Sequence, residues 1–206
     1  MIRHPFVLFV YSAAMGILEA IVVVYLRKIY YPEGFRFPLV PLDPSILRAE
    51  IIREAMTLIM LATVAWMAAA GSWARLMAFL ISFGTWDLAY YAGLKAFLHW
   101  PASLLTPDIL FLIPRVWTGP VLAPALVALS WILAGLLLHR TRYCDLRLGW
   151  KSWGAGLLGC VLILYSFLRP VGPGGEPGFS WTWFGAGYAA GAVMLARAVR
   201  RARRVA

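Results

Sequence analysis

Residues 6–26 read FVLFVYSAAMGILEAIVVVYL, an apolar run in which Glu19 is the one charged residue. About 20 residues of this kind are needed for an α-helix to cross the ~30 Å hydrocarbon core of a bilayer. The run ends at Arg27 and Lys28, whose charges favour water. We therefore predict a transmembrane helix over residues 6–26.

The rest of the chain has the same character. Of its 206 residues, 62% are hydrophobic and 14% are charged, whereas about a quarter of residues are charged in a typical soluble domain. Further spans are predicted at about 52–70, 75–98, 108–139, 152–168 and 179–198. These runs lack the alternation of a membrane barrel, which leaves a helical bundle. The predicted fold class is all-α: one integral membrane domain, residues 1–206, with six transmembrane helices.

The basic residues predict the orientation. The loop after the fourth run and the carboxyl-terminal tail, residues 197–206, are rich in arginine, and such segments face the cytoplasm under the positive-inside rule. The residues that this assigns to the inner side are Arg3, Arg75, Arg140, Arg142, Arg147, Lys151, Arg197, Arg200, Arg201, Arg203 and Arg204. We expect a multi-pass protein of the cell inner membrane with both termini cytoplasmic. Its basic tail favours anionic lipids as partners rather than nucleic acid.

The fourth hydrophobic segment, residues 108–139, is too long for one perpendicular helix and contains Pro114, Gly119, Pro120 and Pro124. It either kinks, or its residues 108–117 form a short outer or re-entrant helix before the span proper. Broken helices at this depth occur where they line a cavity or are buried in protein. Asp108 follows Thr106 and Pro107, an order typical of a helix start, so we expect it to cap a helix.

The outer loop, residues 27–50, carries Tyr30, Tyr31, Phe35 and Phe37. Aromatic rings favour the depth of the lipid headgroups. This loop is therefore either an interfacial anchor or a lid over a site below it.

Three carboxylates, Glu19, Glu54 and Asp87, lie within these apolar segments. An ionisable group at that depth is costly and usually has a function or a charge partner. At 1.5 Å per residue, Glu19 lies about 12 Å below Arg27 and Asp87 about 18 Å below His99. The predicted catalytic residues are therefore Glu19, Glu54 and Asp87, in a polar funnel that opens to the outside.

Helical spacing gives each acid its neighbours. Three predicted faces carry Ser12, Gly16 and Glu19; then Glu50, Glu54, Thr57 and Leu61; and then Gly84, Asp87, Tyr91 and Lys95. The candidate substrate-binding residues are Tyr91, Lys95, His99 and Arg115.

The alternative is that the acids form ion pairs that fix helix packing. In that case Asp87 pairs with Lys95 or Arg115, and Glu54 pairs with Arg53 or Arg48. Glu50 and Arg53 are expected to be solvated at the interface.

Carboxylates at different depths suit general acid and base chemistry, and they also suit a hard cation. A divalent cation held by Glu19, Glu54 and Asp87 is therefore the candidate cofactor. Zinc usually takes several histidines, and His99 is alone on the outer side. The sequence contains no haem or nucleotide signature.

The function predicted first is a membrane-embedded enzyme that acts on a lipid or another hydrophobic substrate by acid/base or cation-assisted chemistry. A structural or assembly subunit of a membrane complex is the first alternative, with other membrane subunits as its partners. A transporter or substrate-binding membrane subunit is the second.

Overall fold

A computed structural model of the chain describes residues 1–141, 148–170, 172, 175 and 177–205. Over these residues the helices are α1 (Pro5–Tyr30), α2 (Pro44–Ala68), α3 (Ser72–Leu98), α4 (Leu122–Leu138), α6 (Trp150–Phe167) and α7 (Trp181–Val205). Two short strands, β1 (Pro107–Phe111) and β2 (Trp117–Pro120), connect α3 to α4. The prediction of an all-α protein is confirmed. Arg142 and Arg147, which we assigned to the inner side, lie outside the described residues.

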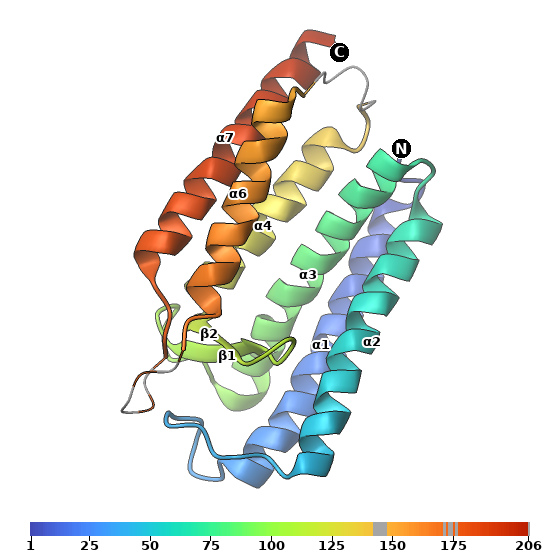
Figure 1. The fold of residues 1–206 in the computed structure, drawn as a ribbon. Coiled ribbons are helices and arrows are strands. Elements are labelled where there is room, and N and C mark those ends of the chain that lie inside the picture. The colour runs from blue at the N-terminus through green and yellow to red at the C-terminus, as the bar shows by residue number, and fades with distance from the viewer. Residues whose placement is uncertain (142–147, 171, 173–174, 176, 206) are drawn as a thin grey trace.

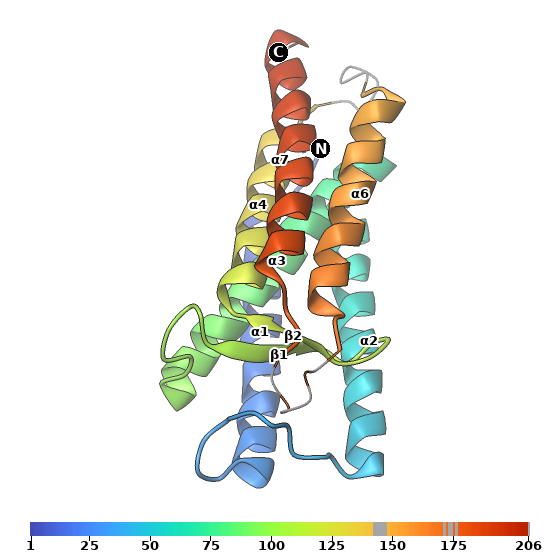
Figure 2. The same ribbon diagram turned by 60° about the vertical axis from the view of Figure 1, so that its left-hand side comes forward.

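The helices run along a common direction, and successive helices alternate in sense (Figure 1). Helix α3 packs against α1, α2 and α4, and α6 packs against α7. Helix α4 contacts α7 less extensively than it contacts α3, so α1–α4 form one group of helices and α6 and α7 form a second. Helix α1 begins and α7 ends at the same end of the bundle, while the β-hairpin lies toward the opposite end, where α1 and α2 extend beyond it (Figures 1 and 2).

Two helices, α1 and α2, are long and apolar enough to cross a membrane by length and composition. Helix α4 is apolar but shorter, with 17 residues. Helix α3 carries Arg75, Asp87 and Lys95 within its length, and such charges weaken the signature of a span. The count of six spans and the side on which the termini lie therefore stay predictions.

Helix α2 begins at Pro44, before the predicted membrane span that starts at about residue 52, and Asp43, Pro44 and Ser45 are typical of a helix start. Asp43 caps it, because its carboxylate accepts a hydrogen bond from the Ser45 backbone N–H at 2.8 Å, and proline suits the first helical position. Hydrogen bonds from the Ser45 hydroxyl and backbone lower the pKa of Asp43. The early start brings Glu50, Arg53 and Glu54 into the helix.

The fourth hydrophobic segment differs from both predicted forms. It is neither a kinked helix nor a re-entrant one: β1 and β2 pair as an antiparallel hairpin, and α4 follows. Pro114, Gly119 and Pro120 oppose a helix here, while Phe111, Trp117 and their neighbours suit strands. Asp108 lies opposite Gly119 in this ladder, so the expectation that it caps a helix was wrong.

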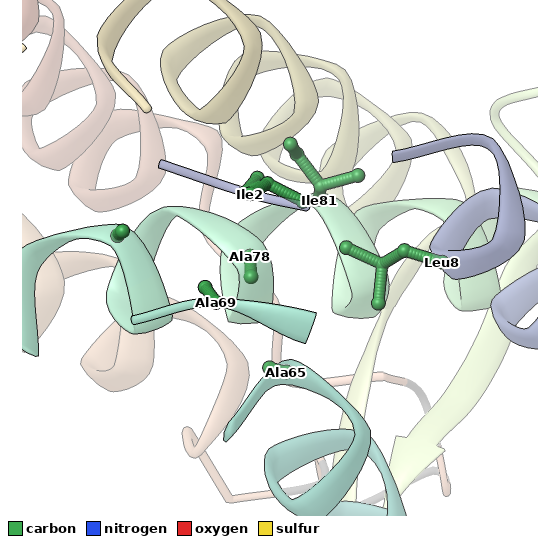
Figure 3. Packing of buried hydrophobic residues seen from close by; sticks show 7 residues of the cluster. Ile2, Leu8, Ala65, Ala69, Ala78 and Ile81 are labelled. Atoms are coloured by element: carbon green, nitrogen blue, oxygen red, sulfur yellow. The ribbon is translucent and has the colours of Figure 1, made fainter. Parts of the chain in front are cut away.

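Small residues set the spacing between helices, as they do in membrane bundles. Gly16 of α1 lies against the Trp86 backbone of α3, and a Cβ built on Gly84 of α3 would lie 2.5 Å from the Ala128 carbonyl oxygen of α4. At the end that holds the termini, an apolar cluster joins α1, α2 and α3 to the first residues of the chain (Figure 3). Its labelled members are Ile2, Leu8, Ala65, Ala69, Ala78 and Ile81.

Candidate functional site

Arg53 of α2 joins two of the acids of the first two helices. It forms an ion pair with Glu19 of α1, and its Nη2 lies 2.7 Å from Glu50 Oε2. The Thr57 hydroxyl also donates to Glu19 at 3.2 Å. We call Glu19, Glu50, Arg53 and Thr57 the Arg53 network. Both carboxylates of this network have Arg53 as their cationic partner, and such pairing offsets part of the free-energy cost of burying charged groups.

The expectation that Glu50 and Arg53 are solvated was wrong. Glu50 is 7% exposed, and the Arg53 side chain is 22% exposed. The predicted faces of α1 and α2 explain this, because Ser12, Gly16 and Glu19 are buried on α1 and the four predicted residues of α2 are buried as well. Arg53 lies beside that buried face and turns toward α1.

Glu54 fixes the turn of the hairpin instead of pairing with Arg53 or Arg48. The Leu112 backbone N–H donates to Glu54 Oε2 at 2.9 Å and to Oε1 at 3.2 Å. A hydrogen bond to a charged acceptor stabilises by about 1.5–3 kcal/mol. Glu54 therefore ties α2 to the segment between β1 and β2.

Replacing Glu54 by alanine should release this turn. We expect Glu54→Ala to speed amide hydrogen exchange over residues 107–120 by about tenfold, because the Leu112 N–H loses a contact of about 1.4 kcal/mol or more. Glu54→Gln keeps an acceptor and should change exchange much less. Equal exchange in Glu54→Ala and the wild type would contradict the role of Glu54.

A second ion pair joins α1 to the hairpin. Arg27 Nη2 donates to Asp108 Oδ1 at 2.8 Å, and the two side chains are 8% and 1% exposed. The guanidinium lies 3.7 Å from the ring centroid of Trp100 and 4.5 Å from that of Phe35, as in cation–π contacts. Phe35, in the segment 27–50 that is predicted as an outer loop, thus lies over this pair.

Asp87 lies beside this pair on the buried face of α3. It is 9% exposed and within electrostatic range of Asp108. Asp87 Oδ2 and Asp108 Oδ2 are both buried with no hydrogen-bond partner among the described residues. Tyr91 lies close enough to Asp108 for its hydroxyl to lower the pKa of that carboxyl group. We call Arg27, Asp87, Tyr91 and Asp108 the aspartate centre.

Burial raises the pKa of Asp108 to about 6, while Arg27 and hydrogen bonds from Ile109 and Tyr91 oppose that rise. A carboxyl group with such a pKa can gain or lose a proton close to neutral pH, which general acid–base chemistry requires. The surrounding wall is aromatic: Trp86 contacts Tyr90 and Phe111, and Phe111 contacts Trp117. Buried polar atoms without partners are rare and often mark functional sites.

The other predicted binding residues lie apart from the aspartate centre. Lys95 donates to the carbonyl oxygens of His99 and Pro101, so it caps the end of α3 instead of pairing with Asp87. His99 is the residue that ends that helix. Arg115 is exposed in the turn between β1 and β2 and forms no ion pair with Asp87 among the described residues. Of the four candidates, the structure brings Tyr91 to Asp87.

The three acids predicted as one group are divided between three settings. Glu19 pairs with Arg53, Glu54 binds the Leu112 N–H, and Asp87 lies near Asp108. Within the described part of the chain, no three His, Cys, Asp or Glu side chains converge as metal ligands would. The geometry therefore gives no support to a cation held by Glu19, Glu54 and Asp87 together.

The sequence reasoning missed Arg27 and Asp108 as site residues. Arg27 was taken as the charge that ends the first span, and Asp108 as a helix cap. One signal was available, because each lies at the predicted outer end of an apolar segment and their charges are opposite.

Comparison with protein-family models, curated proteins and solved structures finds no match for the chain.

Proposed function

We propose that the chain is a membrane-embedded enzyme that acts on a lipid or another hydrophobic substrate at the aspartate centre. The observation that carries the proposal is the pair of buried carboxylate oxygens, Asp87 Oδ2 and Asp108 Oδ2, which have no partner among the described residues. Burying a carboxylate oxygen without a hydrogen-bond partner among apolar and aromatic side chains lowers the stability of the fold. A protein keeps such an oxygen mostly where its function uses it.

Asp87 is the candidate general acid or base, because its carboxyl group forms no ion pair among the described residues. Asp108 is held by Arg27, so it can accept or return a proton while its position stays fixed. Two carboxyl groups with different partners can take opposite roles in one reaction. Phe35 and Trp100 shield the pair from water on the side of the outer loop.

A membrane location is supported by the two apolar helices, α1 and α2, and by the exposed apolar side chains elsewhere in the bundle. Leu133 and Leu137 of α4 and Leu157 and Val161 of α6 are each more than half exposed. Basic residues gather at the end that holds the termini, which is the cytoplasmic end under the positive-inside rule. The aspartate centre then lies toward the outer leaflet.

The test is lipid turnover by the purified chain. The wild type, Asp87→Asn and Ser82→Ala are reconstituted with a total membrane lipid extract, and the lipids are compared over time by mass spectrometry. Ser82 is the matched control, since it is a buried polar residue of the same helix whose partner is Ser12. We expect the wild type and Ser82→Ala to convert a lipid species that Asp87→Asn leaves unchanged, by a factor of about 100 or more. Equal turnover in the wild type and Asp87→Asn would refute the proposal.

A structural or assembly subunit is the second candidate, and the Arg53 network favours it. Its carboxylates are paired within the chain, as expected of acids that only hold helices together. If this function is the correct one, neither Asp87→Asn nor the wild type changes any lipid. The chain should then co-purify in a mild detergent with another membrane subunit.

A further inference from the structure

Outside the aspartate centre, the hairpin end of the bundle contains an open groove of about 470 Å³ between the hairpin turn and α6. Arg115 and Arg169 line it together with Val161, Leu164, Tyr165 and Leu168. Figure 2 shows the turn of the hairpin below the lower end of α6 and beside α2. The groove therefore combines two cations with an apolar wall.

The two arginines are available to an external anion. Both are exposed, and the ion pairs among the described residues involve Arg27, Arg36 and Arg53 instead. A guanidinium presents a planar fork of N–H donors that matches the oxygens of a phosphate. Two such groups in one groove form a site for a phosphate ester.

The wall of the groove extends from these cations along α6. Arg169 follows the end of α6, and Val161 lies about 12 Å further along the helix at 1.5 Å per residue. Val161 and Tyr165 are each 52% exposed, although both are large and apolar. An apolar wall that begins at two neighbouring arginines suits an amphiphile with an anionic head and a hydrocarbon tail.

We propose that this groove binds an anionic phospholipid, with its phosphate between Arg115 and Arg169 and an acyl chain along Val161, Leu164 and Tyr165. The proposal rests on the membrane location that the proposed function assumes, but it does not depend on the chemistry at Asp87. Its occupant is a lipid and not a free phosphate, because the apolar wall adds nothing to the binding of a headgroup alone.

The test is native mass spectrometry of the purified full chain in a neutral detergent, titrated with phosphatidylglycerol, phosphatidylcholine or soluble glycerol phosphate. We expect one phosphatidylglycerol to be retained, and the double variant Arg115→Gln/Arg169→Gln to bind it at least about tenfold more weakly. The matched control is Lys28→Gln/Arg48→Gln, which removes the same charge from exposed positions at the same end. It should bind as the wild type does.

Equal loss in the two double variants would overturn the proposal, because net charge alone would then explain binding. Glycerol phosphate binding as tight as that of the lipid would overturn it as well. Asp87→Asn should bind phosphatidylglycerol like the wild type. If the chain binds the lipid in the groove but converts no lipid, only the proposed function is refuted. If the chain converts lipid but binds phosphatidylglycerol without needing Arg115 and Arg169, only the proposed groove site is refuted.

Discussion

Arg53→Met should lower the free energy of unfolding by about 3–5 kcal/mol, the cost of removing one partner from a buried ion pair. Arg53 is the cation shared by Glu19 and Glu50, which are 8% and 7% exposed. Without it, two carboxylates from different helices face each other with no counter-charge. Thermal unfolding in detergent, followed by the loss of helical circular dichroism, measures the effect.

Two further variants separate this pairing from a general effect of charge. The triple variant Glu19→Gln/Glu50→Gln/Arg53→Met removes the whole set of charges and should recover most of the stability, because no unpaired charge remains. Arg36→Met breaks the exposed Arg36–Glu33 pair, whose side chains are 76% and 81% exposed, and should change stability by less than about 1 kcal/mol. A triple variant as unstable as Arg53→Met would contradict this account of the network.

Gly84→Ala should have the second large effect, a loss of about 3 kcal/mol. A Cβ at this position would lie 2.5 Å from the Ala128 carbonyl oxygen and 2.8 Å from Ile132 Cγ1. The first of these atoms belongs to the backbone of α4 and cannot rotate away. Since α3 packs closely against α4, the methyl group should push these two helices apart.

Gly154→Ala is the matched control, because Gly154 lies in α6 and a Cβ there meets no heavy atom within 4 Å. Alanine costs less conformational entropy than glycine in a helix, so this variant should gain about 0.5–1 kcal/mol. Both variants are compared by thermal unfolding in the same detergent. Equal stability of Gly84→Ala and Gly154→Ala would mean that the α3–α4 contact is looser than described.

The helical part of the fold could be predicted because helical periodicity is local. The spacing of Ser12, Gly16 and Glu19 predicts one face, and these residues are buried together on α1. On α3, Gly84, Asp87 and Tyr91 are buried as predicted, while Lys95 is exposed. Lys95 is exposed because it lies near the end of α3, where its side chain reaches water.

The partners of the acids could not be predicted, because they depend on how helices are placed in space. Arg53 lies one position from Glu54 and three from Glu50 in sequence, yet it also reaches Glu19 on another helix.

The hairpin could not be predicted for a related reason. Pro114 and Pro120 exclude a regular helix, but they do not show whether the chain kinks or forms strands, and the choice follows from pairing between β1 and β2.

The stability of Asp87→Asn tests most directly the claim that Asp87 serves function and not structure. Asp87 has no ion pair among the described residues and lies near the like charge of Asp108. An amide in its place removes that repulsion. We therefore expect Asp87→Asn to melt at the same or a higher temperature than the wild type, whereas Asp108→Asn, which leaves buried Arg27 without its counter-charge, melts lower. If Asp87→Asn melts as low as Asp108→Asn, then Asp87 holds the fold together and the account of the aspartate centre is wrong.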